Sequence, residues 1–370
     1  MNQDVLNIIE PTLEGEEGHC YNFINSLCQV AGDQRIVVWG GRSVHITFNG
    51  QVTLKRFFVR QIRRLQALWL YRKLLRQPGR MFISTAGRTD LVLLDLASRE
   101  VIPGSKVFLY MHWLKLSENK YEQMTKLARK QPNLTIITPT QSVCDILHGA
   151  GFHNTLQAPY PITPCQDMGK MSQRIEFSTL LFAGSARQDK GFHAVVSFVE
   201  YLAENNMDIP VTLQTSTTHY GKVDEATTRD ILWLDALHYP FLKRCPETLT
   251  DEMYRKLYRG AICLQPYNQN DFADRISGIT LDALSSGCPV ITVQGTWMAR
   301  IAARFDAGLA IPETSPGTIL KAVNHIRDDY HRYQHNAFRA GQTLQREHSA
   351  SGLFSILTAG CTQSSKETRQ

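Results

Sequence analysis

One short segment combines a glycine turn with two cations, which suits the binding of a phosphate group. The segment Gly184-Ser-Ala-Arg187-Gln-Asp-Lys190-Gly191-Phe192 follows an apolar run and precedes a helical pattern. A helix N-terminus offers unpaired backbone amides and the positive end of the helix dipole. Arg187 and Lys190 would add two charges at that place. The segment predicts a diphosphate site, although the P-loop motif is absent; the alternative is a solvated turn with two surface cations.

Two aspartates flank the start of a second predicted helix. Asp274 and Asp282 are separated by seven residues, and Ser277 and Gly278 lie between them. Serine is a favourable N-cap, and glycine lets a ligand come close to the backbone. A phosphate at this helix start would therefore have one acid on each side. The alternative is an ordinary helix that carries two surface aspartates and ends at Gly287.

A histidine follows the apolar run Val107–Met111, which predicts a buried strand. In parallel sheets, ligands bind outside the carboxyl ends of the strands. This position makes His112 a candidate site residue. The alternative is an ordinary core or surface histidine.

The stretch Lys55–Arg76 contains eight Lys or Arg residues and no acid. Read as one helix, it places four arginines on one face and an apolar stripe on the other: Arg56, Arg60, Arg63 and Arg64 against Leu54, Phe57, Phe58, Ile62, Leu65, Leu68 and Trp69. A cationic amphipathic helix with aromatic residues suits an anionic membrane surface. The alternative is a helix packed on its own domain with a solvated basic face. Nucleic-acid binding is not expected, because no recognition motif accompanies the charge.

Short apolar runs separated by helical patterns predict a first α/β domain over residues 1–158 with a parallel sheet. The expected helix is Tyr21–Val30, and the expected strands are Val5–Glu10, Arg35–Trp39, Met81–Ser84, Leu91–Leu94, Lys106–Met111 and Thr135–Thr138. Three prolines then lie close together, at positions 159, 161 and 164, and predict a linker over residues 159–175.

A second alternating series predicts another α/β domain over residues 176–345, followed by a C-terminal helix and tail over 346–370. The expected strands are Thr179–Phe182, Val211–Gln214, Ile231–Leu234, Ala261–Gln265 and Pro289–Val293. The expected helices are Phe192–Asn205, Asp251–Tyr258 and Thr280–Ser286, with more helix over Pro316–Leu344. The fold class is therefore α/β, with two Rossmann-like, doubly wound domains facing each other across a cleft.

Composition and charge agree with a two-domain globular protein of 370 residues, 43% of them hydrophobic and 20% charged. Residues 1–160 hold 19 Lys and Arg against 12 acids, a net charge of +7, whereas residues 161–370 hold 21 against 22, a net charge of −1. A basic first half suggests contact with an anionic surface.

The acidic start, with no basic residue before position 18, is unlike a secretory signal, so a cytoplasmic protein is expected. The eight cysteines include no C-x2-C pair, so neither a disulfide framework nor a structural zinc site is expected, and buried free thiols are.

Together these features resemble the retaining, nucleotide-sugar-dependent glycosyltransferases of the GT-B fold that carry an E-x7-E motif, as in glycosyltransferase family 4. The run Ile8-Ile9-Glu10-Pro11 with Gly15 to His19 is similar to their first strand and glycine loop. Ile137–Ser142 is similar to the segment that leads toward their interdomain linker, and Lys190-Gly191 to their phosphate-binding pair. The most diagnostic match is Asp274-x7-Asp282, here with aspartate in place of both glutamates.

The resemblance implies a role for each candidate residue. The second domain would hold a UDP- or GDP-sugar, and the first a glycan or lipid-linked acceptor. Arg187 and Lys190 would offset charge on the leaving diphosphate in place of a metal ion, and the amides of Ser277, Gly278 and Ile279 would hold the distal phosphate. Asp274 would contact the sugar, Asp282 the ribose, and His112 the reacting face of the sugar. Gly15, Gly18 and His19 would form the acceptor loop.

The expected activity is transfer of a sugar with retention of configuration, in bacterial surface polysaccharide synthesis at the inner face of the membrane. Two alternatives remain open. The shortened acids, and Ser185 in place of the usual arginine before the lysine, also fit a weak or inactive binding or scaffold protein. An inverting transferase or an epimerase is the other alternative, with His19 or His112 as the base of an inverting reaction.

Overall fold

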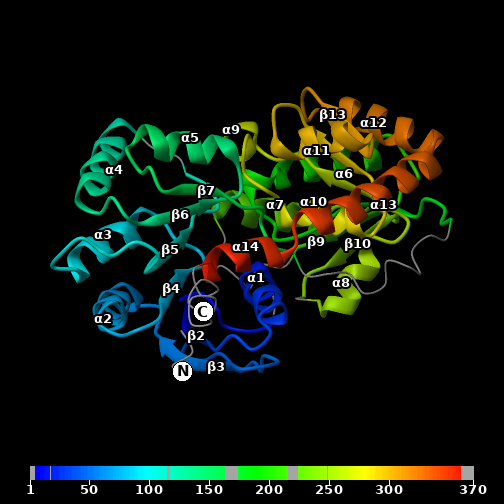
Figure 1. The fold of residues 1–370 in the computed structure, drawn as a ribbon. Coiled ribbons are helices and arrows are strands. Elements are labelled where there is room, and N and C mark those ends of the chain that lie inside the picture. Colours follow the sequence, from blue (N-terminus) through cyan, green and yellow to red (C-terminus); the bar gives the residue numbers. More distant parts are fainter. Residues whose placement is uncertain are drawn as a thin grey trace. The chain divides into compact units, whose positions relative to one another are not determined.

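The computed structural model of the chain describes residues 5–16, 18–114, 117–162, 174–215, 224–247 and 249–359. The described residues divide into two compact units (Figure 1). One is drawn from Met1–Pro164 and His348–Gln370, and the other from Cys165–Glu347. Residues 163–173, which make up most of the expected linker, and the tail from residue 360 lie outside the described residues.

The first unit is built on a parallel sheet with the strand order β3-β2-β1-β4-β5-β6-β7 in its described residues. The strands are β1 (Leu6–Ile9), β2 (Ile36–Gly41), β3 (Val52–Phe58), β4 (Arg80–Ile83), β5 (Val107–Tyr110), β6 (Thr135–Thr138) and β7 (Thr155–Gln157). The helices are α1 (Gly18–Gln29), α2 (Arg63–Leu75), α3 (Arg88–Ala97), α4 (Glu118–Lys130), α5 (Gln141–Gly149) and α14 (Ala350–Thr358). The central strands β1, β5 and β6 are short, have apolar residues at most positions and are buried along their whole length, as expected for a parallel sheet covered on both faces.

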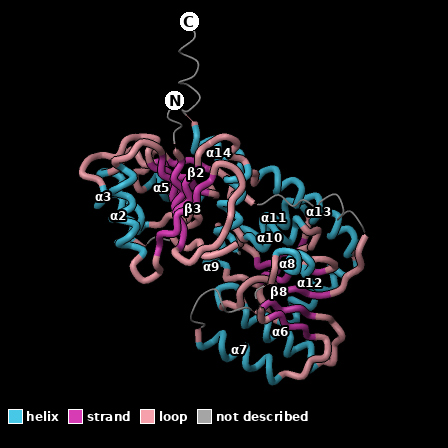
Figure 2. Tube along the Cα trace, turned by 90° about the horizontal axis from the view of Figure 1, so that it is seen from below, coloured by secondary structure: helices cyan, strands magenta, loops and turns pink. Residues whose placement is uncertain are grey.

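Helices cover both faces of this sheet and create two apolar cores. Side chains of α2, α3, α4 and α5 pack in one core, and side chains of α1 and α14 pack in the other. Figure 2 shows α2 and α3 on one side of β2 and β3, with α14 on the other side. The C-terminal helix α14 thus returns to the first unit, where Arg80 donates to the carbonyl oxygens of Leu357 (2.7 Å) and Ala359 (2.9 Å) at its end.

The second unit has a parallel sheet with the strand order β10-β9-β8-β11-β12-β13 over its described residues. The strands are β8 (Thr179–Phe182), β9 (Val211–Gln214), β10 (Leu242–Cys245), β11 (Ala261–Gln265), β12 (Val290–Val293) and β13 (Gly308–Ile311). The helices are α6 (Phe192–Glu204), α7 (Glu225–Ala236), α8 (Asp251–Leu257), α9 (Gln269–Phe272), α10 (Gly278–Ser285), α11 (Trp297–Phe305), α12 (Pro316–Asp328) and α13 (Tyr330–Glu347). In Figure 2, α6 and α7 lie on one side of β8, and α10 and α11 on the other.

The expectation of two α/β units with parallel sheets is confirmed, but two expected strands are wrong. Leu91–Leu94 lies inside the helix α3, and Ile231–Leu234 lies inside the helix α7. Both are four-residue apolar runs, and a run this short has no period that separates a strand from a buried turn of helix. The chain instead supplies four strands that were not expected, namely β3, β7, β10 and β13.

The expectation of a single helix over Lys55–Arg76 is also wrong. Its first residues belong to the edge strand β3, which pairs in parallel with β2, and the helix α2 begins only at Arg63. The face of α2 that packs on the unit carries Ala67, Leu70, Tyr71 and Leu74 rather than the expected stripe. In the described part of the chain, no helix is both long enough and apolar enough to span a membrane.

Candidate functional site

Lys190 and the start of α10 meet at Gly184. This glycine follows β8 with φ of +92°, a conformation that other residues rarely adopt, and its amide donates to Gln214 Oε1 at 2.6 Å. A Cβ atom at Gly184 would lie 2.8 Å from Lys190 Nζ and 3.1 Å from Ile279 Cδ1. The structure therefore brings together two of the segments singled out from the sequence, although about ninety residues separate them along the chain.

Lys190 is partly buried beside an aromatic ring, and its burial disfavours the charged form. It ends the 3-10 turn Gln188–Lys190, and its Nζ lies 5.9 Å from the ring centroid of Tyr267. Burial lowers the pKa of Lys190 to about 8; the nearby Arg187 adds to this effect, which Asp189 opposes. A bound anion would restore the balance of charge, so this lysine is suited to a phosphate.

Arg275 completes a cationic cluster that the sequence analysis did not assign. Arg187 Nε donates to Asp189 Oδ1 at 2.8 Å, and Arg275 Nη1 lies 3.7 Å from Asp189 Oδ2. Arg275 also lowers the pKa of Lys190. Arg187 and Arg275 therefore share the carboxylate of Asp189, and together with Lys190 the cations outnumber this acid beside Gly184. In the sequence, the one sign that Arg275 belongs to this cluster was its position directly after the motif residue Asp274.

The start of α10 has the expected local structure. Ser277 is the N-cap, and its Oγ accepts from the amide of Thr280 at 3.3 Å. Thr280 Oγ1 donates to Gln265 Oε1 at 2.8 Å and so attaches the first turn to the end of β11. A Cβ atom at Gly278 would meet nothing within 4 Å, so a ligand has room beside this backbone. The first amides of a helix have no partner within the helix and can hold a phosphate oxygen.

The two motif aspartates have different surroundings. Asp274, before α10, forms an ion pair with Arg300 of α11, in which Oδ1 and Nη2 are 2.6 Å apart. Asp282 lies on the exposed side of α10 and accepts from the hydroxyl of Tyr254 in α8 at 3.3 Å. The structure thus places one acid on each side of the helix start, beside α11 and α8 respectively.

His112 lies in the first unit, directly after β5 as expected. Its Nε2 donates to the carbonyl oxygen of Ser84 at 2.8 Å, and because a carbonyl oxygen only accepts, this nitrogen carries a proton. Three aromatic rings surround it, with centroid distances of 5.6 Å to Phe23, 4.9 Å to Tyr110 and 5.4 Å to Tyr160. The ring is therefore fixed in orientation.

Glu10 fixes the backbone beside His112. It is fully buried at the end of β1 and accepts from Ser84 Oγ at 2.8 Å, Thr85 Oγ1 at 2.7 Å and the amide of Thr12 at 3.1 Å. A buried carboxylate with these donors ties the ends of β1 and β4 together. The sequence analysis quoted Glu10 only as part of a motif and gave it no role.

The glycine loop of the first unit is described only in part. Gly15 is partly exposed, with open space where a Cβ atom would lie, and Gly18 begins α1. The side chain of His19 lies outside what the structure describes. Among the described side chains, no group of three or more His, Cys, Asp or Glu residues is arranged to hold a metal ion.

Comparison with known proteins gives matches in structure alone. No protein-family model and no curated protein matches the sequence. The sucrose-phosphate synthase from Thermosynechococcus elongatus superposes with a TM-score of 0.70 at 11% identity, covering 98% of both chains. Anabaena Alr3699/HepE in complex with UDP-glucose gives 0.68 at 12% identity, covering 97% of this chain and 99% of its own. WaaG, a glycosyltransferase involved in lipopolysaccharide biosynthesis, gives 0.64 at 13% identity, covering 96% and 100%. The two parallel α/β units of this chain have the GT-B fold that these structures share.

Proposed function

We propose that the chain is a glycosyltransferase that uses a nucleotide sugar. The observation that carries this proposal is the approach of Lys190 Nζ to Gly184 and to Ile279 at the start of α10. A cation of lowered pKa beside a glycine turn and the first amides of a helix would suit a diphosphate, which supports the proposal. The fold likeness to a protein bound to UDP-glucose supports the same ligand class.

In the proposed donor complex, a UDP- or GDP-sugar lies over the carboxyl ends of β8 and β11. Lys190, Arg187 and Arg275 offset the charge that develops on the leaving diphosphate, so the reaction needs no added metal ion. The amides of Ser277, Gly278 and Ile279 hold the distal phosphate.

The acids complete the donor site. Asp282 binds the ribose hydroxyls beside Tyr254, and Asp274 accepts from the sugar hydroxyls. His112 serves the reacting face of the sugar, which is transferred with retention of configuration. Its fixed ring suits a positioning role, because a catalytic geometry requires an orientation set in advance.

We also propose that the acceptor is a glycan or lipid-linked saccharide and that the first unit meets it at an anionic membrane. The protein would then work on the inner face of a bacterial membrane, in the synthesis of a surface polysaccharide. At the start of α2, the N-cap residue Ile62 is 48% exposed, and Leu65 and Trp69 of the helix are 70% and 55% exposed. Leu65 and Trp69 are four residues apart and fall on one side of the helix. Lys73 Nζ lies 5.2 Å from the ring centroid of Trp69. Apolar side chains among cations are typical of a membrane-surface contact.

Calorimetry with UDP, GDP and their sugar derivatives tests the donor site directly. Lys190→Ala should weaken nucleoside diphosphate binding by about 1.5–3 kcal/mol, the value of a hydrogen bond to a charged group. Unchanged affinity would reject the assignment of Lys190. Donor hydrolysis or transfer by the purified protein establishes an enzyme, and the anomer of the product separates retention from inversion.

A binding or scaffold protein is the second candidate. The Asp274–Arg300 ion pair favours it, because it engages one oxygen of the acid that would contact the sugar. Nucleotide binding without hydrolysis or transfer, for every donor and acceptor tested, would support the scaffold function.

A further inference from the structure

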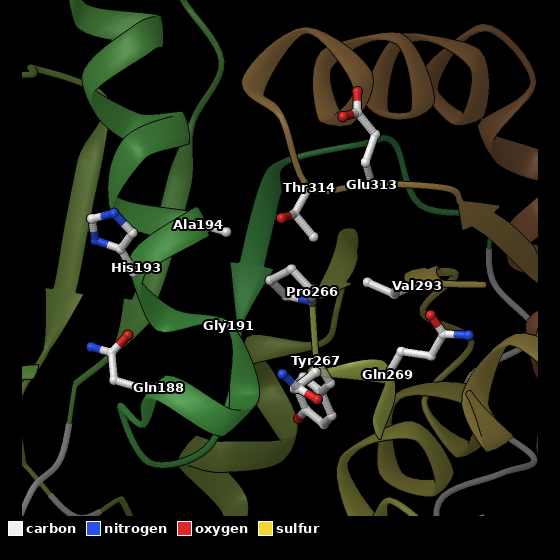
Figure 3. A pocket seen from close by; sticks show the side chains of 11 residues that line it. Gln188, Gly191, His193, Ala194, Pro266, Tyr267, Gln269, Val293, Glu313 and Thr314 are labelled. Atoms are coloured by element: carbon white, nitrogen blue, oxygen red, sulfur yellow. The ribbon is translucent and has the colours of Figure 1, made fainter. Parts of the chain in front are cut away.

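The cavity drawn in Figure 3 has a volume of about 400 Å³ and lies in the second unit, at the start of α6. Three of its polar side chains are turned toward neighbouring groups of the protein. Gln188 Nε2 donates to Asp230 Oδ2 at 2.8 Å, and His193 Nδ1 lies 3.0 Å from Asp230 Oδ1. Glu313 accepts from two hydroxyl groups that follow it in the chain. These side chains do not converge on one ligand, whereas the contacts around His112 in the first unit have a direct consequence.

One hydrogen bond does not by itself set the tilt of the His112 ring. Its Nε2 donates to the carbonyl oxygen of Ser84 at 2.8 Å, but the torsion that turns an imidazole ring has broad minima. The neighbouring aromatic rings therefore decide how the ring is tilted. Phe23 and Tyr110 are buried in the core, whereas Tyr160 is only partly buried. The centroid of the Tyr160 ring lies 5.4 Å from that of His112, so whatever holds Tyr160 in place also limits His112.

His348 holds the backbone on both sides of the Tyr160–Pro161 peptide bond. Its Nδ1 donates to the carbonyl oxygen of Tyr160 at 2.7 Å, and its own carbonyl oxygen accepts from the amide of Ile162 at 3.1 Å. Because a carbonyl oxygen only accepts, Nδ1 carries a proton whether the imidazole is neutral or charged. His348 is only 7% exposed, so water competes little for this hydrogen bond.

The chain is also fixed just before Tyr160. The amide of Ala158 donates to the carbonyl oxygen of Thr138 at 2.9 Å, and the carbonyl oxygen of Ala158 accepts from the hydroxyl of Tyr110 at 3.0 Å. Tyr160 therefore lies between two anchored points of the backbone, which together set the direction of its side chain. The second anchor, His348, comes from a position 188 residues further along the chain.

The helix α14, which follows His348, has contacts of its own with the first unit. Its N-cap is Ser349, and three of its side chains are buried: Ala350, Leu353 and Leu357. At its other end, Arg80 donates to the carbonyl oxygens of Leu357 and Ala359. These contacts hold α14 on the unit independently of the His348 side chain. The hydrogen bond from His348 therefore acts mainly on the segment that carries Tyr160.

We propose that His348 is a positioning residue for His112 and that it acts through Tyr160. The side chain of His348 fixes the backbone of Tyr160, and the ring of Tyr160 then limits how far the ring of His112 can turn. The orientation of His112 is thereby set before a substrate binds. The use of His112 in sugar transfer rests on the proposed function, but the dependence of its orientation on His348 does not.

The test uses the full chain with isotope-labelled histidines, whose ring signals are recorded by NMR. His112→Gln identifies the signals of His112 by their loss. His348→Leu removes the donor to Tyr160, whereas His348→Asn keeps a donor near the position of Nδ1. Arg80→Met removes the hydrogen bonds at the far end of α14 and is the matched control for loosened docking of this helix.

His348→Leu should shift or broaden the ring signals of His112, and His348→Asn should restore most of the wild-type pattern. Arg80→Met should leave the pattern unchanged even where its melting temperature falls. In a transfer or donor-hydrolysis assay, His348→Leu should lower kcat by about tenfold or more, because a small displacement of a reacting group is costly. The affinity for the nucleoside diphosphate should stay within about twofold of the wild type, since His348 lies outside the second unit.

Unchanged His112 signals in a folded His348→Leu variant would overturn the proposal. An equal change in Arg80→Met would also overturn it, because the signals would then report how α14 is docked. Tyr160→Leu keeps the main-chain carbonyl but removes the ring, so it decides the matter if His348→Leu does not fold: altered His112 signals support the proposal, and unaltered ones reject it. A chain without transfer or hydrolysis whose His112 signals respond as expected supports the role of His348 and rejects the enzymatic function alone.

Discussion

The carboxylate of Asp274 lies 2.6 Å from the guanidinium of Arg300, and both side chains are about half exposed. An exposed ion pair of this kind contributes about 0–1 kcal/mol to stability, so folding does not require it. Because the ion pair lies beside the start of α10, it decides how Asp274 is held next to this helix. Arg300 holds the acid toward α11, whereas Asp282 is attached to α8 through Tyr254. The two motif acids can therefore be tested independently.

Asp274→Asn and Asp282→Asn should have different effects. If Asp274 contacts the sugar, Asp274→Asn should lower transfer by about tenfold or more while free UDP or GDP binds within about twofold of the wild type. If Asp282 contacts the ribose, Asp282→Asn should weaken the nucleoside diphosphate and the sugar nucleotide alike. Transfer assays and calorimetry on both variants measure this. Small and equal effects in every assay would point to the scaffold function.

Binding of the diphosphate should depend on pH through Lys190. With a pKa of about 8, this lysine is charged at pH 7 and largely neutral at pH 9, so affinity should fall as the pH rises through 8. Calorimetry in buffers of different ionisation enthalpy should detect proton uptake near pH 8, because a bound anion raises the pKa. Lys190→Ala should flatten this profile between pH 7 and 9. An unchanged profile in the variant would assign the titration to another group.

The same lysine predicts a trend in stability without ligand. Its pKa is lower in the folded chain than in the unfolded one, so the unfolded chain binds more protons between pH 8 and the usual lysine value. The free energy of unfolding should therefore rise with pH across this interval through Lys190. Denaturant melts of the wild type and Lys190→Ala, compared at each pH, isolate the contribution. A variant whose stability keeps the full pH dependence of the wild type would contradict this sign.

Gly184 and Gly278 should respond differently to alanine. Gly184→Ala puts a Cβ atom 2.8 Å from Lys190 Nζ at φ of +92°, which should cost about 1–3 kcal/mol and also weaken nucleotide binding. Gly278→Ala meets nothing within 4 Å, so its melting temperature should stay near that of the wild type while the added methyl group crowds a bound phosphate. Thermal melts and calorimetry check both. Normal melting and binding in Gly184→Ala would show that Lys190 lies elsewhere in solution.

Membrane binding should depend on the exposed side of α2 and its neighbouring arginines. A cation near an anionic leaflet contributes about 1 kcal/mol, so reversing Arg56, Arg60, Arg63 and Arg64 to glutamate should release the protein from anionic vesicles. Leu65→Ser with Trp69→Ser should weaken binding without a change in charge, since both side chains are exposed. Sedimentation with vesicles at low and high salt measures both. Wild-type protein that stays in solution even at low salt would favour a soluble acceptor, and nucleotide binding is the control for folding.

The sequence by itself determined the features that depend on neighbouring residues. The strands β1, β5, β6, β8, β9 and β11 are short runs built around apolar residues, with an occasional Asn, Thr or Gln, and a strand buried on both faces favours this composition. The start of α10 at Ser277 and its end before Gly287, which has φ of +68°, were likewise set locally, by a capping hydroxyl and a glycine. The sequence did not separate strand from helix in Leu91–Leu94, because four residues are too few to show a period.

Only the tertiary structure decided which of these local features meet. Gly184 follows β8 and Ile279 follows β11, and the two approach each other because β8 and β11 are neighbours in the sheet although β9 and β10 lie between them in the chain. No local pattern encodes that strand order, since it depends on how the crossover helices pack. The ion pair of Asp274 with Arg300, the contact of Arg275 with Asp189 and the lowered pKa of Lys190 follow from the same packing. The charge, burial and distances at this site depend on the assembled sheet. The identity of the residues that form the site could be read from the sequence.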